Sequence, residues 1–155
     1  VKDGNDLVAR EHIAYGSTMA GIAMQLTSTP AQHSMEHAMS AYHQELPHGA
    51  GLIMISKEYY THFINKNVCP ERFIRMAQAL GLKDADKPMD FITALTQLQK
   101  ECAVDDLKMS EYGIQSSEFM SMAKNARETM GGLFMCDRVP LSDQECAAIY
   151  EKSFK

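Results

Sequence analysis

The spacing of apolar residues is the feature that most narrows what this chain can fold into. Across residues 5–27, apolar and small side chains recur every three or four positions, as they do along one face of an α-helix. No segment shows the alternation of apolar and polar residues that is typical of a half-buried β-strand. The pattern predicts an all-α protein: a helical bundle of about six or seven helices that forms one domain over residues 1–155.

Prolines, glycines and capping residues divide the rest of the chain into helices. We expect Thr29 to cap a helix that begins at Pro30 and runs to about Tyr42. Pro47 disfavours helical geometry in the residue before it, so a new helix is predicted to begin near His48. Further helices are predicted in residues 69–81 and 88–103, in 116–132 with Ser116 or Ser117 as cap, and in 142–154 after a Ser142-x-x-Glu145 capping box.

The first predicted helix contains two glycines at positions where alanine would form a helix more readily. Gly16 and Gly21 both lie in its middle. Close approach of another backbone would explain them, so we expect this helix to be buried at the centre of the domain.

Composition excludes several functional classes. The net charge of −5 leaves no basic face for nucleic acid, and no glycine-rich phosphate-binding loop is visible. No apolar run approaches the roughly 20 residues of a membrane span, and the first residues lack the pattern of a secretion signal. We therefore expect a cytoplasmic protein without a membrane or nucleic-acid partner.

The four cysteines lie far apart and form no Cys-x-x-Cys pair. Free, buried thiols in a reducing cytoplasm are the expected state. They are Cys69, Cys102, Cys136 and Cys146.

Four of the six histidines fall within residues 31–49. His33 and His37 are four positions apart, so both imidazoles project from one face of the predicted helix, at the spacing that two helix-borne metal ligands need. His48 follows the break at Pro47, where a turn can fold its ring back toward the first two. The spacing predicts that three imidazoles can converge on one point.

Less specific interpretations exist for the same residues. Two histidines at helical spacing are more often surface residues than ligands. His43 can interact with the carbonyl end of its helix, and the isolated His12 and His62 suggest no site. Glu36 and Glu45 could orient an imidazole, but we expect each to be a solvated carboxylate.

The stretch "HSMEHAMSAYHQELPHGAG" resembles the second signature of the iron-containing (group III) alcohol dehydrogenases, which include lactaldehyde reductases and propanediol dehydrogenases. In that family a helix carries His-x-x-x-His and is followed by Pro-His-Gly. The stretches "AREHIAYGSTMAGIAM" and "VPLSDQECAAIYEKSF" are similar to the helix before the signature and to the C-terminal helix. The family pairs an N-terminal dinucleotide-binding α/β domain with a C-terminal helical domain, and this chain resembles only the second.

The resemblance implies roles for the histidines. His33 and His48 match metal ligands, whereas His37 matches a histidine near the nicotinamide and the substrate, and so is the expected catalytic and cofactor-contacting residue. The implied cofactors are a divalent metal, with iron favoured and zinc compatible, and NAD or NADP in the full-length enzyme. The implied reaction interconverts small alcohols with aldehydes or ketones.

Part of the family's site is missing from this sequence. The family completes its metal shell with an earlier Asp-x-x-x-His helix, but no aspartate here stands four residues before a histidine. The chain also begins with Val1, so we expect a processed chain or a piece of a longer protein that is inactive alone. The N-terminal domain is then the expected partner, and an apolar face left without it could support a homo-oligomer.

Two departures from the family pattern concern the turn. The stretch between His37 and His48 is one residue longer than usual, and Ser40 stands where a glycine is common. We expect the extra residue to enlarge the turn at residues 43–45.

Two other functional classes fit parts of the sequence. A stand-alone helical module could bind a metal or a partner without catalysis. A di-metal carboxylate bundle is disfavoured, because Glu45-x-x-His48 is the only Glu-x-x-His motif.

Overall fold

A computed structural model describes residues 2–155, and it confirms the all-α prediction. Seven α-helices and three short 3₁₀ helices form the described part of the chain, which contains no β-strand. The α-helices are α1 (Leu7–Thr27), α2 (Ala31–Tyr42), α3 (His48–Asn65), α4 (Pro70–Ala79), α5 (Asp90–Glu101), α6 (Phe119–Met130) and α7 (Asp143–Ser153). The 3₁₀ helices are η1 (Met109–Tyr112), η2 (Ser116–Glu118) and η3 (Gly131–Cys136).

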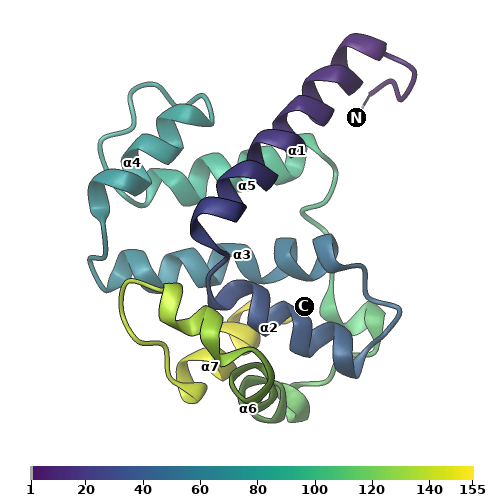
Figure 1. Cartoon of the computed structure of the whole chain (residues 1–155), viewed down its shortest axis with the longest axis vertical. Coiled ribbons are helices and arrows are strands. Elements are labelled where there is room, and N and C mark those ends of the chain that lie inside the picture. Colours follow the sequence, from purple (N-terminus) through teal and green to yellow (C-terminus); the bar gives the residue numbers. More distant parts are fainter. Residues whose placement is uncertain (1) are drawn as a thin grey trace.

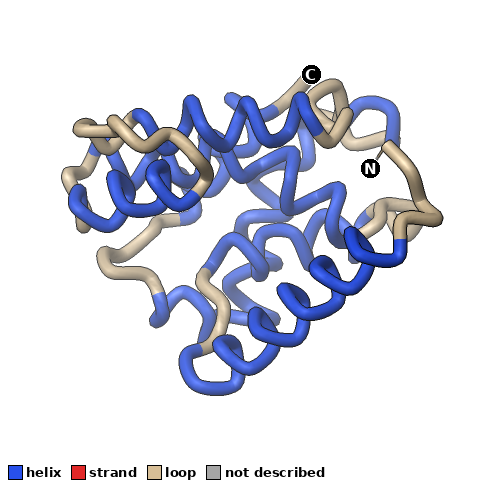
Figure 2. Tube along the Cα trace, turned by 90° about the horizontal axis from the view of Figure 1, so that it is seen from above, coloured by secondary structure: helices blue, strands red, loops and turns tan. Residues whose placement is uncertain are grey.

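Helix α3 crosses the middle of the molecule and joins its two halves (Figure 1). On one side it packs against α2 and α7, and α6 closes that half by contacting both of them. On the other side it contacts α5, which pairs with α4. A view from above shows helices throughout, linked by short loops (Figure 2).

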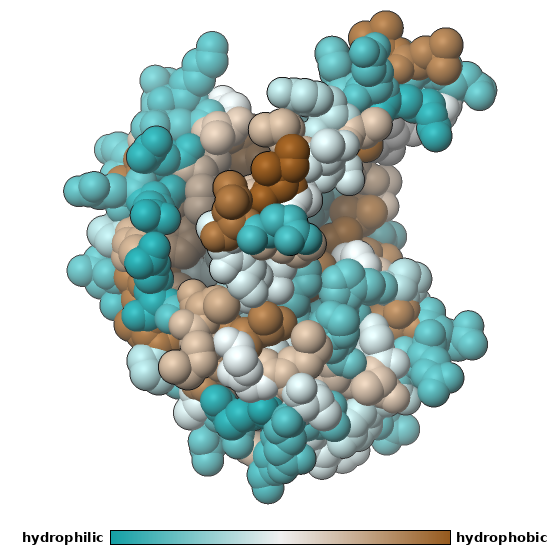
Figure 3. All heavy atoms as spheres, in the orientation of Figure 1, coloured by the Kyte–Doolittle hydropathy of each residue, from teal (hydrophilic) through white to brown (hydrophobic). Residues whose placement is uncertain are grey.

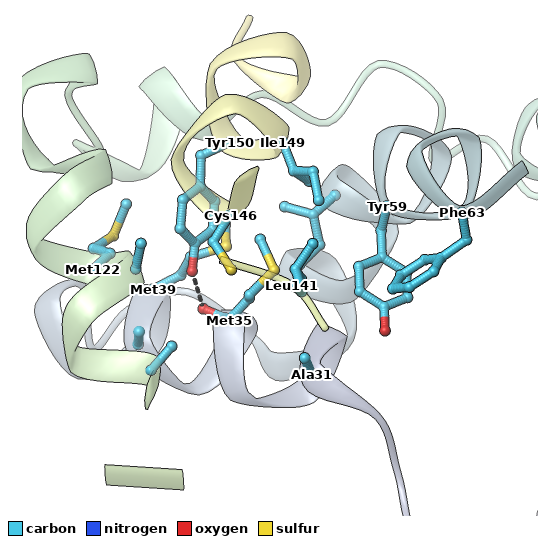
Figure 4. Packing of buried hydrophobic residues seen from close by; sticks show 14 of the residues in the cluster. Ala31, Met35, Met39, Tyr59, Phe63, Met122, Leu141, Cys146, Ile149 and Tyr150 are labelled. Atoms are coloured by element: carbon cyan, nitrogen blue, oxygen red, sulfur yellow. Dashed lines mark hydrogen bonds between the residues drawn. The ribbon is translucent and has the colours of Figure 1, made fainter. Parts of the chain in front are cut away.

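The main core lies between α2, α3, α6 and α7 (Figure 4). Met35 and Met39 of α2 are fully buried, as is Tyr150 of α7. The Tyr150 hydroxyl donates a hydrogen bond of 2.6 Å to the backbone carbonyl of Met35. This contact fixes α7 against the helix that carries two of the predicted site histidines.

Aromatic rings join the other half. Tyr60 of α3 lies edge-on to Phe91 of α5, with ring centroids 5.2 Å apart. Phe73 of α4 completes the group, 5.7 Å from Phe91. Such tilted and edge-to-face pairs are the geometries that aromatic rings prefer.

The prediction that the first helix is buried was wrong. Helix α1 contains no buried residue, and it extends away from the rest of the molecule (Figure 1). A Cβ added to Gly16 or Gly21 would meet nothing within 4 Å, so no backbone in the described structure packs there. Periodicity shows that a helix has an apolar face, but it cannot show whether the element covering that face belongs to the same chain.

Two of the predicted caps also differ from the structure. Pro30, not Thr29, is the N-cap of α2, and its side chain has no polar atom to cap that end. The Gln32 side chain bonds to α3 instead of completing a capping box. The capping box near α6 is formed by Gln115 and Glu118, which flank Ser116 and Ser117. The Ser142–Glu145 capping box of α7 is confirmed.

All four cysteines are free, but only Cys146 is buried. Cys136 is exposed because it ends η3 at the surface, and the other two are partly covered. Within residues 2–155, no helix has the length and apolar character needed to cross a membrane.

Candidate metal centre

The site is built where α2 and α3 meet. The Gln32 side-chain amide donates to the backbone carbonyl of Leu52, at 3.1 Å, and so ties the start of α2 to α3. The connection between the helices is short. His43 is the C-cap of α2, and the Leu46 N–H donates a hydrogen bond of 3.0 Å to the His43 carbonyl. Pro47 is the N-cap of α3, so α3 begins with His48 itself. His48 is therefore placed at the first position of α3, directly after the turn.

The structure brings all three predicted histidines together. The ring centroid of His48 lies 5.2 Å from that of His33 and 5.1 Å from that of His37. His33 is partly buried, whereas His37 and His48 are exposed. We call these three residues the histidine cluster. The two centroid distances do not separate His33 from His37, but the group of ligand atoms described below contains His37 and not His33. The division into ligand and proton carrier remains a prediction.

A buried carboxylate lies beneath the histidine cluster. Glu36 has no exposed surface, and its Oε2 contacts Nδ1 of His48. Its other oxygen, Oε1, accepts a hydrogen bond of 2.5 Å from the Ser40 hydroxyl. Ligand atoms of Glu36, His37 and His48 all lie within 4.8 Å of one another. The expectation of a solvated carboxylate was wrong for Glu36, whereas Glu45 is exposed as expected.

Gly51 of α3 makes room for Glu36. A Cβ at this position would lie 2.6 Å from Cγ and 2.8 Å from Oε1 of Glu36. Atoms cannot approach so closely, so any other residue here would displace the glutamate or the helix. Sequence reasoning missed this pairing, and the signals for it were a glycine inside a helix and the i, i+4 spacing of Glu36 and Ser40.

Electrostatics favours the neutral form of the His33 ring. Burial lowers the pKa of His33, and the neighbouring His48 and His37 lower it further, against a smaller opposing effect of Glu36. A neutral imidazole is the form that binds a metal ion. Imidazole nitrogens are ligands that suit iron or zinc.

The other three histidines lie outside the cluster. Nε2 of His43 is 3.0 Å from Oε2 of Glu118, so this ring joins the end of α2 to η2. His12 is exposed on α1. Nε2 of His62 is buried and lies 3.7 Å from Oε1 of Glu145.

One known protein family matches this chain over nearly its whole length. Residues 1–154 match the family described as "Fe-containing alcohol dehydrogenase family, C-terminal". This chain belongs to that family. Its helical fold is that of the family's C-terminal domain: it superimposes with a TM-score of 0.91 on an archaeal halo-thermophilic alcohol dehydrogenase from a Red Sea brine pool, at 29% identity over 99% of this chain.

Curated members of the family are similar in sequence. A 1,3-propanediol dehydrogenase of Klebsiella pneumoniae is 28% identical over 97% of this chain, and the probable alcohol dehydrogenase EutG of Escherichia coli is 31% identical over 81%. The chain spans only 39% of the first of these proteins and 40% of the archaeal structure. It therefore corresponds to the C-terminal part of enzymes that are more than twice as long.

Proposed function

We propose that this chain is the metal-binding helical part of an NAD(P)-linked alcohol dehydrogenase that interconverts small alcohols with aldehydes or ketones. The observation that carries the proposal is the convergence of His33, His37 and His48 in a chain that belongs to the iron-containing alcohol dehydrogenase family.

In this proposal His33 and His48 hold a divalent metal through neutral ring nitrogens. Bound there, the metal would act as a Lewis acid on the oxygen of the substrate. Burial suits His33 to this role, because it disfavours the protonated ring. Two imidazoles alone hold a divalent ion weakly, so the remaining ligands and the nucleotide site would come from a region outside this chain.

His37 is proposed to carry the proton that leaves or joins the substrate oxygen. Its ring is exposed, so a substrate could reach it, and imidazole titrates near neutral pH. The role is tested in the full-length enzyme by the variant His37→Ala. Turnover should fall by roughly 100-fold or more, which is the usual contribution of a general acid–base group, while the metal content stays the same.

The control for that experiment is His43→Gln, which alters a histidine outside the cluster. This variant should change neither turnover nor metal content. Loss of metal from His37→Ala would make His37 a ligand and contradict the proposed role.

The coding DNA upstream of Val1 tests the larger proposal. An open reading frame with an Asp-x-x-x-His helix and a glycine-rich nucleotide-binding segment is the expected result. A start codon directly before Val1 would contradict it. That result would favour the second candidate, a helical module that binds a metal or a partner without catalysis.

A direct assay separates the same two candidates. We expect the 155-residue chain alone to show negligible NAD-linked turnover, because it lacks half of the ligands implied by the family. Robust turnover by the isolated chain would contradict the proposed division of the site.

A further inference from the structure

We propose that Glu36 is a positioning residue that fixes the tautomer and orientation of His48. The inference deepens the proposed function, on which its metal-binding part rests. Its starting point is the contact between Oε2 of Glu36 and Nδ1 of His48, which joins a fully buried carboxylate to a half-exposed ring.

The location of Glu36 argues against a chance contact. Burying an unpaired carboxylate is very costly, so a buried glutamate needs hydrogen-bond donors for its oxygens. Here one oxygen accepts from the Ser40 hydroxyl, at 2.5 Å, and the other faces the His48 ring. Both donors lie in the short segment that also carries the histidine cluster.

Gly51 supports the same conclusion from the opposite helix. Glycine inside a helix is destabilising relative to alanine. Here it leaves the space that the Glu36 side chain fills, because a Cβ would come within 2.6 Å of Cγ. Ser40, His48 and Gly51 thus together define the position of the Glu36 carboxylate.

The position of the Glu36 carboxylate determines which ring nitrogen of His48 carries the proton. When a carboxylate accepts from Nδ1–H, the proton is held on that nitrogen and Nε2 keeps its lone pair. Nε2 is then the atom that His48 offers on the side away from Glu36. Carboxylates that bind the second ring nitrogen of a metal-ligating histidine orient the ring and make it a better ligand.

The test reads the tautomer of His48 by ¹⁵N NMR of the histidine rings, on the whole 155-residue chain without metal and at a pH where the rings are neutral. The wild-type chain should show His48 protonated at Nδ1, whereas free imidazole side chains favour the Nε2–H form. Glu36→Met keeps the side-chain volume and removes the acceptor, so His48 should revert to Nε2–H. Glu36→Gln keeps an acceptor oxygen and should retain Nδ1–H.

Glu45→Met is the matched control, because Glu45 is an exposed glutamate of the same segment. It should leave the tautomer unchanged. An Nε2–H ring in the wild-type chain, or an unchanged tautomer in folded Glu36→Met, would overturn the proposal. The wild-type spectrum alone decides the first point, so the test does not depend on the folding of a variant.

A titration with Co²⁺ extends the test to metal binding. Affinity should fall by roughly 10–100-fold in Glu36→Met, by less in Glu36→Gln, and not at all in Glu45→Met. Equal affinities in Glu36→Met and the wild type would contradict the positioning role. Absence of Co²⁺ binding in every variant would instead contradict the proposed function, and the tautomer result would stand independently.

Discussion

The hydroxyl of Tyr150 in α7 bonds the backbone carbonyl of Met35 in α2, one residue before Glu36. Both residues are completely buried (Figure 4). Burial raises the pKa of Tyr150 well above its ordinary value, so the hydroxyl keeps its proton and remains a donor. The last helix of the chain therefore supports the helix on which the candidate site is built.

Tyr150→Phe should reduce the free energy of unfolding by about 1 kcal/mol, because it removes one buried hydrogen bond and preserves the ring packing. Urea denaturation measures the change. Tyr15→Phe is the control, since Tyr15 is 68% exposed on α1, and it should have little effect. Equal stability of Tyr150→Phe and the wild type would show that this hydrogen bond does not support the fold.

Gly51→Ala should destabilise the protein even though alanine favours a helix. The new Cβ would overlap the Glu36 side chain, and overpacking in a close-packed interior costs about 1–3 kcal/mol, more than the roughly 0.5–1 kcal/mol gained in helix propensity. Gly49→Ala is the control, because a Cβ there meets nothing within 4 Å, and it should be neutral or slightly stabilising. Thermal unfolding of both variants measures the difference. A Gly51→Ala protein as stable as Gly49→Ala would mean that the Glu36 carboxylate does not pack against α3.

Helix α1 should exchange its backbone amide hydrogens much faster than α2. None of its residues is buried, so little tertiary packing protects it from local unfolding. Apolar surface is visible at its free end (Figure 3), and its exposed apolar residues include Leu7, Val8, Ile13, Ile22 and Leu26. Hydrogen exchange followed by mass spectrometry at low and high protein concentration measures the protection. Protection of α1 that rises with concentration would indicate self-association through this helix, and protection equal to that of α2 at low concentration would contradict the exposed position.

The free energy of unfolding should fall at acid pH as Glu145 becomes protonated. The hydrogen bond from Lys66 and that from the Ser142 backbone lower the pKa of Glu145 from 4.5 to about 2. Because the folded state binds this proton less readily than the unfolded state, the contribution of Glu145 is complete above pH 4.5 and is lost as the pH falls toward about 2. Glu145→Gln should lessen the loss of stability over this range, as measured by urea denaturation at several pH values. An identical pH profile in the variant would contradict the ion pair with Lys66.

Local signals made much of the fold and site predictable. Pro47 and the spacing of His33, His37 and His48 lie within one short segment, and the helix boundaries there follow from backbone restrictions that act over a few residues. The Ser142–Glu145 cap is local in the same way. Non-local facts were not predictable: the burial of Glu36 depends on Gly51 in the facing helix, and the exposure of α1 depends on what packs beside it.

In the proposed function, His33, His37 and His48 form part of a divalent-metal site. NMR of the histidine rings during addition of a small amount of paramagnetic Co²⁺ tests it directly, because even weak binding broadens or shifts signals near the ion. The rings of the histidine cluster should respond first, while those of His12 and His62 should not. Co²⁺ that leaves the cluster unchanged, or that affects His12 and His62 equally, would contradict the claim.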